Sequence, residues 1–88
     1  IALAPEVNIL MDDKQNYYVM SIIAGDRPGL LSRITRVLAA NHINIYSAKI
    51  STLGERAEDT FLINGAVLHD QKQMVKLESE LLAELRAS

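Results

Sequence analysis

The chain has 88 residues, of which 49% are hydrophobic, and a formal net charge of -2 at pH 7. This length allows one domain with its own core, and the absence of cysteine excludes disulfides and thiolate metal sites. The charge excludes a general role at nucleic acid or an anionic membrane surface, because no basic stripe is available to release counterions. No apolar run approaches the ~20 residues of a membrane span, and no signal peptide is visible, which indicates a cytoplasmic protein.

The N-terminal part of the chain predicts two strands. The chain opens at Ile1 rather than Met, so we interpret it as a fragment of a longer protein, with residues 1–5 as a linker remnant and 6–88 as one domain. Residues 6–11 alternate in a way that is typical of a short strand. Residues 17–24 are apolar on both faces, which predicts a central strand covered on both sides.

The segment Gly25-Asp26-Arg27-Pro28-Gly29-Leu30-Leu31 connects this strand to a predicted helix over 28–40. Pro28 has no backbone N–H and suits the first helical turn. Asp26 is placed to accept hydrogen bonds from the exposed N–H groups there. A strand-to-helix corner with unpaired N–H groups predicts a place to hold a small anionic group. Asn41 is expected to end the helix in the left-handed conformation.

The second half of the chain predicts a hairpin and a final helix. In the strand predicted over 43–53, the alternation changes phase, which predicts a β-bulge near Tyr46-Ser47. Gly54-Glu55 predicts the hairpin turn. The pairs that follow from it are Leu53 with Arg56, Ile50 with Asp59, Lys49 with Thr60 and Ala48 with Phe61. Asp70 is expected to cap a helix that runs to about Arg86.

The order β-β-α-β-β-α predicts an α+β fold. Without its first strand it is a ferredoxin-like split βαβ that lacks its last strand. We predict a four-stranded antiparallel sheet with both helices on one face and the N-terminal strand in the edge position of the missing strand. The other face then presents apolar side chains to water, which indicates a partner surface. These side chains are Tyr17, Val19, Ile23 and Leu62.

The sequence shows no convincing catalytic or metal-binding set. Neither His42 nor His69 has a cluster with ligand spacing, so we predict no metal, no cofactor and no catalytic residue. A small phosphatase on the same fold would need an arginine and asparagine pair at positions where none is convincing. RNA recognition needs several stacking aromatics on the sheet, and only Tyr17 qualifies. Asp59 is expected to face inwards, either paired near the sheet rim or shaping an interface or ligand pocket.

Two segments resemble a known family. Residues 26–31 (Asp-Arg-Pro-Gly-Leu-Leu) and 39–45 (Ala-Ala-Asn-His-Ile-Asn-Ile) resemble the signature of ACT domains, which implies a ferredoxin-like regulatory module that binds amino acids, usually as a dimer. Residues 48–61 and the strand over 6–9 are similar to the C-terminal ACT domain of the bacterial protein-PII uridylyltransferase family. That resemblance implies allosteric glutamine sensing in nitrogen metabolism, with nucleotidyltransferase and hydrolase activities in other domains.

Carried over residue by residue, the resemblance implies a ligand site at the corner. Its residues are Asp26, Arg27, Gly29 and Leu30, with Asn44 across from them. The carboxylate of Asp26 suits a ligand's ammonium group and repels its carboxylate. The expected partners are a small amino acid, glutamine, and the rest of the parent chain, with a homodimer or a pairing of two ACT domains through the sheet. The alternative is an association module that binds no ligand and uses the apolar sheet face, the ligand going to a companion ACT domain.

Overall fold

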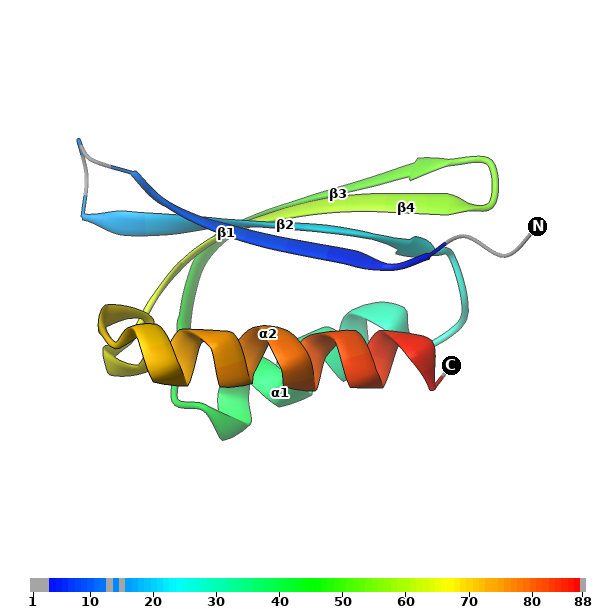
Figure 1. The fold of residues 1–88 in the computed structure, drawn as a ribbon. Helices are drawn as coiled ribbons and strands as arrows, with labels where there is room; N and C mark the ends of the chain where they lie inside the picture. Colours follow the sequence, from blue (N-terminus) through cyan, green and yellow to red (C-terminus); the bar gives the residue numbers. More distant parts are fainter. Residues whose placement is uncertain (1–3, 13, 15, 88) are drawn as a thin grey trace.

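The computed structural model describes residues 4–12, 14 and 16–87 and shows a four-stranded sheet with helices on one face (Figure 1). The elements are β1 (Glu6–Asp12), β2 (Tyr17–Gly25), α1 (Leu30–Ala40), β3 (Asn44–Leu53), β4 (Arg56–Asn64), the 3-10 helix η1 (Ala66–His69) and α2 (Gln71–Arg86). The strand order is β1-β2-β4-β3, and all neighbours are antiparallel. The predicted fold is confirmed, with β1 in the edge position beside β2. Residues 1–3 of the expected linker lie outside the described residues.

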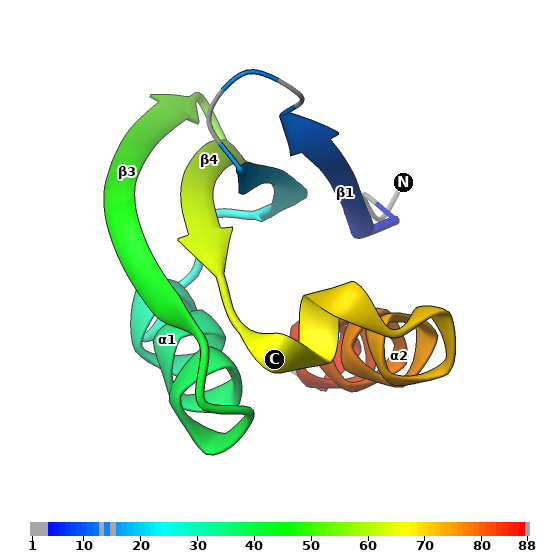
Figure 2. The ribbon, with the colours of Figure 1, turned by 90° about the vertical axis from the view of Figure 1, so that its left-hand side faces the viewer.

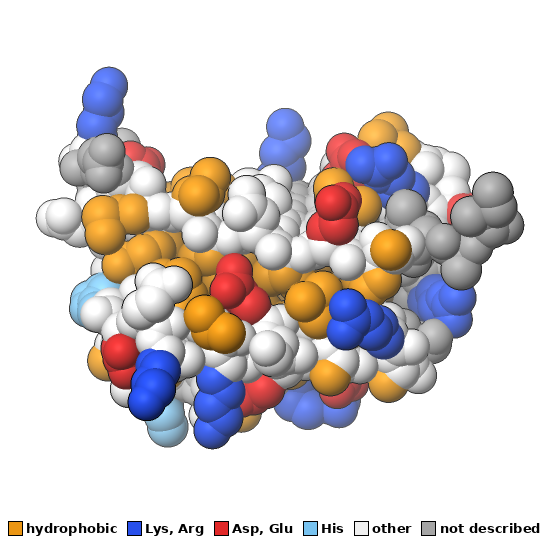
Figure 3. Space-filling model, in the orientation of Figure 1, with side chains coloured by type: hydrophobic (Ala, Val, Ile, Leu, Met, Phe, Trp, Pro, Cys, Tyr) orange, Lys and Arg blue, Asp and Glu red, His pale blue; other side chains and the backbone are white. Residues whose placement is uncertain are grey.

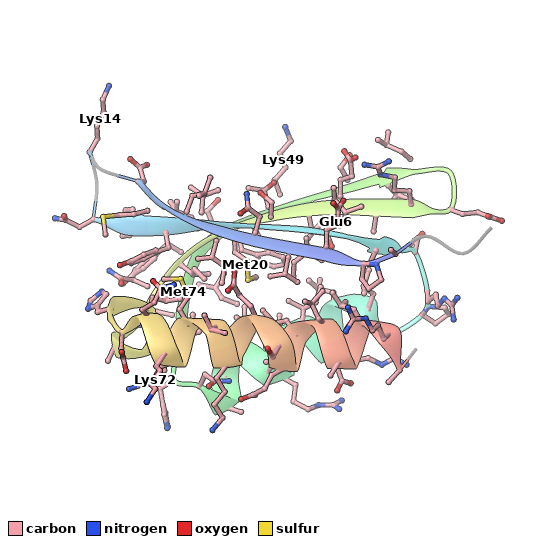
Figure 4. The ribbon with its side chains drawn as sticks, in the orientation of Figure 1. Glu6, Lys14, Met20, Lys49, Lys72 and Met74 are labelled. Carbon is pink, nitrogen blue, oxygen red and sulfur yellow. The ribbon has the colours of Figure 1, made fainter. Side chains whose placement is uncertain are left out.

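The core lies between the sheet and the two helices. Alternate residues of β2 and β4 face the helices and are buried, as the period of two along a strand requires. In Figure 4, Met20 of β2 and Met74 of α2 point into the space between these layers. Figure 2 shows α1 on the β3 side and α2 on the β1 side. The side chains that are less than 2% exposed are Phe61, Met20, Ile22, Ile34, Leu38, Ile63, Leu68, Leu77 and Leu81.

The hairpin of β3 and β4 has the predicted register. Leu53 pairs with Arg56 across the Gly54-Glu55 turn, and all the other pairs expected from that turn are present. The bulge is also confirmed, because the register shifts between Ile45 and Ser47. Tyr46 is the inserted residue, and its ring centroid lies 4.6 Å from that of Tyr17 at the start of β2.

The start of α1 differs from the prediction. The helix begins at Leu30 rather than Pro28, and no side chain caps it. Gly29 precedes it in the left-handed conformation, with φ of 81°. Asp26 instead makes a backbone hydrogen bond, in which its N–H donates to the Glu55 carbonyl oxygen at 2.7 Å. The contact with the hairpin, which no local pattern predicts, therefore fixes the corner.

The end of α1 also differs from the prediction. Asn41 is not left-handed, because its φ is -98°. His42 takes the left-handed conformation, with φ of 57°. The Asn41 side chain instead donates from Nδ2 to the Val37 carbonyl oxygen at 2.8 Å, which satisfies one of the helix's last acceptors. The predicted Asp70 cap of α2 is confirmed, since its Oδ1 accepts from the Lys72 N–H at 3.4 Å.

The exposed apolar surface lies elsewhere than predicted. Tyr17, Val19, Ile23 and Leu62 are only partly exposed. The most exposed large apolar side chains of the sheet belong to its two edge strands, with the bulged Tyr46 among them. They are Leu10, Met11, Ile45, Tyr46, Ile50 and Leu53. None of the helices in the described part of the chain is long and apolar enough to cross a membrane.

Candidate functional site

A cleft lies at the corner where β2 turns into α1, beside the hairpin of β3 and β4. Figure 1 shows the course of the chain at this corner. The volume of the cleft is about 220 Å³. This lies below the roughly 300–1,000 Å³ of pockets for drug-sized ligands, so the cleft suits a single small metabolite. The residues that line it are Asp26, Arg27, Gly29, Leu30, Leu31, Ser32, Ile50, Thr52, Ala57 and Asp59.

Backbone contacts hold the two walls of the cleft together. Gly25, the last residue of β2, pairs with Arg56 at the start of β4. The next residue, Asp26, donates its N–H to Glu55 in the hairpin turn. These contacts place the corner against the β3–β4 hairpin, so that residues 26–32 form one wall and residues of β3 and β4 form the other.

The first turn of α1 supplies the polar character of one wall. The first N–H groups of a helix have no partner inside the helix, and α1 has neither a side-chain cap nor an acidic residue in its first turn. The positive end of the helix dipole therefore faces the cleft and favours an anionic group. Gly29 sets the turn into the helix, because its positive φ is strained for other residues.

Asp59 supplies a buried carboxylate to the other wall. Its side chain is 3% exposed, and its Oδ1 accepts a hydrogen bond from the Ser51 N–H at 3.3 Å. Burial raises the pKa of the Asp59 carboxyl, the bond from Ser51 partly offsets this, and the nearby Asp26 carboxylate raises the pKa further. The cleft thus combines a helix N-terminus with two carboxylates, which is the charge pattern of a zwitterionic ligand.

The structure brings together four of the five residues implied by the resemblance. Asp26, Arg27, Gly29 and Leu30 all line the cleft. Asn44 does not, because it pairs with Asn64 at the far end of β3. The prediction that it lies across from the corner is therefore wrong within one chain.

Several lining residues were missing from the predicted site. The predicted hairpin register placed Asp59 opposite Ile50 and facing inwards, so it could have indicated that these two residues belong to the site. Ser32 gave no such signal, because its place on the cleft depends on where α1 begins. The histidines lie elsewhere: His69 Nε2 is 3.0 Å from Asn64 Oδ1, and its ring lies near that of Tyr18. The described residues contain no group of three or more His, Cys, Asp or Glu that could hold a metal.

Comparison with known families identifies the fold. The model of the ACT domain family matches residues 18–86. The chain belongs to the ACT domain family. This ACT domain is 52% identical over 84 residues to a bifunctional uridylyltransferase/uridylyl-removing enzyme of Chromobacterium violaceum, which covers 96% of the chain and 10% of that protein. It is 50% identical over 86 residues to the enzyme of that name from Nitrosospira multiformis, with 98% and 10% covered. The chain therefore spans about a tenth of the length of these relatives.

A solved structure shares the fold of this ACT domain. A protein described as unknown, from Galdieria sulphuraria, superposes with a TM-score of 0.63 over 78% of the chain and 38% of its own. The two sequences are 24% identical. At this identity the likeness shows the ACT fold alone.

Proposed function

We propose that this ACT domain is a non-catalytic, cytoplasmic sensor of glutamine that controls the two activities of a bifunctional uridylyltransferase/uridylyl-removing enzyme. The observation that carries the proposal is the cleft at the β2–α1 corner, where an uncapped helix N-terminus and the carboxylates of Asp26 and Asp59 line one space of about 220 Å³. The identity of about half with the two uridylyltransferases supports the parent enzyme. Glutamine follows from the resemblance to their C-terminal ACT domain.

The charges of the cleft suggest how an amino acid is oriented. The ligand's carboxylate lies at the N-terminus of α1, where the helix dipole and the N–H groups favour an anion. Its ammonium group lies toward Asp26, which lines the same cleft. Such binding shifts the parent between two states only if the ligand has different affinities for them.

Pairing of two ACT domains through β3 would complete the site. β3 is an edge strand whose residues are exposed along nearly its whole length, and such an edge is a template for pairing with another strand. In an antiparallel pair, the start of one β3 lies beside the end of the other. The Asn44 of a second ACT domain would then lie near Leu53, at the cleft end of the first. This arrangement explains how Asn44 can serve the ligand although it is distant within one chain.

Calorimetry with glutamine tests the proposed function. We expect saturable heat and an increase in melting temperature when millimolar glutamine is added to the chain. In the S32D variant, a carboxylate in the first turn of α1 should stabilise the helix but repel the ligand's carboxylate, so affinity should fall at least tenfold. The matched control is S79D, at an exposed position of α2 away from the cleft, which should bind as the wild type does. Absence of both heat and thermal shift in the wild type would contradict the proposal.

A second function is favoured by the exposed apolar residues of β3. In that case the domain only associates with other domains, and a companion ACT domain binds the ligand. It predicts self-association or docking without any response to glutamine. The calorimetric experiment separates the two functions, because only the sensor responds to glutamine.

A further inference from the structure

Asp59 is a buried acid that the structure of the domain does not require to be charged. Its side chain is 3% exposed, and the Ser51 N–H is the one hydrogen-bond donor that the described residues give it. An asparagine at this position could accept the same hydrogen bond without the cost of burying a carboxylate. The second carboxylate oxygen remains available, and the residue lines the cleft.

The charged groups around Asp59 leave the cleft side of the sheet negative on this wall. The charged residues that line the cleft are Asp26, Arg27 and Asp59. The neighbours of Asp59 along β4 point to the opposite face, where Arg56 Nη2 and Glu58 Oε1 pair at 2.7 Å. Lys49 of β3 extends from that face, away from the helices (Figure 4). The pKa of Asp59 is raised by burial and by Asp26, and no described cationic group contributes to lowering it.

A positively charged ligand group would offset both causes of the raised pKa of Asp59, its burial and its repulsion by Asp26. A cation next to two carboxylates favours their ionised forms, and an ammonium group offers three donors where a carboxylate offers only acceptors. The first turn of α1 lines the same cleft, and its N-terminus attracts the ligand's carboxylate. The helix N-terminus and the pair of carboxylates therefore match the two ends of an α-amino acid.

We propose that the Asp59 carboxylate binds the ammonium group of the ligand, which lies between it and the carboxylate of Asp26. This inference deepens the proposed function and rests on it, since it concerns the same cleft. It restricts the ligands to compounds with a protonated amine beside a carboxylate. Deaminated or N-acylated analogues are excluded, whatever their side chain.

The deciding experiment compares D59N with the wild type in calorimetric titrations with glutamine. Asparagine keeps the acceptor for Ser51 and removes the charge, so D59N should remain folded and bind glutamine at least tenfold more weakly. E58Q is the matched control, because Glu58 is the adjacent residue on the opposite face of β4, and its affinity should equal that of the wild type. The monoamide of glutaric acid, which is glutamine without its amino group, should bind both the wild type and D59N weakly and to the same extent.

Proton release gives a second measurement. Because burial raises the pKa of Asp59, the folded wild type keeps a proton on this carboxyl at pH values just above the ordinary aspartate pKa of about 3.9, and the titrations are made in that range. Binding of an ammonium group should expel this proton. Titrations in two buffers of different ionisation enthalpy should therefore show proton release in the wild type that is absent or much smaller in D59N.

The outcomes separate the two proposals. If the wild type binds glutamine and D59N binds equally well, the role of Asp59 is overturned while the proposed function stands. The same conclusion follows if the deaminated analogue binds the wild type as tightly as glutamine does. If the wild type does not bind glutamine at all, both proposals are overturned.

Discussion

The adjacent strands β3 and β4 have similar apolar content but opposite burial. Every second residue of β4 is buried, whereas no residue of β3 is fully buried. The reason is position: β4 has a strand on each side, and β3 lies at the edge. In the direct pair Ala48–Phe61, the β4 residue is 1% exposed while its β3 partner is exposed. Shared alternation thus tells which residues face the same way, but not whether anything covers them.

The largest difference between the strands should appear in stability. F61A removes a fully buried ring from the core and should lower the free energy of unfolding by about 3–5 kcal/mol. I50A truncates a β3 side chain that is 50% exposed, so it should cost about 1 kcal/mol or less. Urea denaturation monitored by circular dichroism measures both. Similar losses in the two variants would mean that β3 is covered in solution.

The second prediction concerns association through β3. I45D places a charge on an apolar side chain that is 40% exposed on the edge strand. It should weaken dimerisation at least tenfold, about 1.4 kcal/mol, because pairing through β3 would bury a carboxylate without a partner in an apolar contact. Sedimentation velocity at several concentrations measures the effect.

The matched control for association is V75D, since Val75 of α2 is 50% exposed and lies outside β3. Figure 3 shows apolar side chains along the seam between β1 and α2, which offers a competing surface. Loss of the dimer in V75D but not in I45D would place the interface on α2 and contradict pairing through β3.

The smallest expected effect is on the pH dependence of stability. It arises from the one buried charged residue of β4, a feature that the exposed strand β3 lacks. The pKa of Asp59 is raised in the folded state, mainly by burial. The folded protein therefore binds more protons than the unfolded chain just above the ordinary aspartate pKa, and the wild type loses stability as pH rises through that window. D59N lacks this loss, so its melting temperature should exceed that of the wild type at pH 7, and the difference should shrink toward pH 4. A difference that does not vary with pH would contradict the burial of a charge at this position.

The ends of α1 show what local sequence patterns can and cannot predict. The helix and its apolar face were predictable from the spacing of Leu30, Ile34 and Leu38, which are all buried. The first residue of the helix was not predictable, because the local sequence alone allows a start at Pro28, with Asp26 just before it to accept from the free N–H groups. The contact between Asp26 and the hairpin turn decides where the chain bends. At the other end, Asn41 and His42 are both able to adopt positive φ, and only the side-chain bond of Asn41 distinguishes them.

The candidate site was predicted only in part, again because local patterns do not determine contacts between distant segments. The corner residues Asp26, Arg27, Gly29 and Leu30 are consecutive or nearly so, and they share the cleft because the chain is short between them. Asn44 is joined to them by a helix of 11 residues, and the antiparallel register carries it to the far end of β3. A residue's membership of a site depends on such distant geometry, which no spacing along the chain provides.

The sequence by itself determined the four strands and two helices apart from the ends of α1, the hairpin register, the bulge at Tyr46 and the inward direction of Asp59. These follow from periodicity and turn chemistry, which act between residues close in the chain. Only the tertiary structure decided that β3 lies uncovered, that Asn44 is remote from the corner, and that Asp59 lines the cleft with Asp26. Burial and electrostatic environment are set by what packs against a residue, and in this fold those neighbours come from distant parts of the chain.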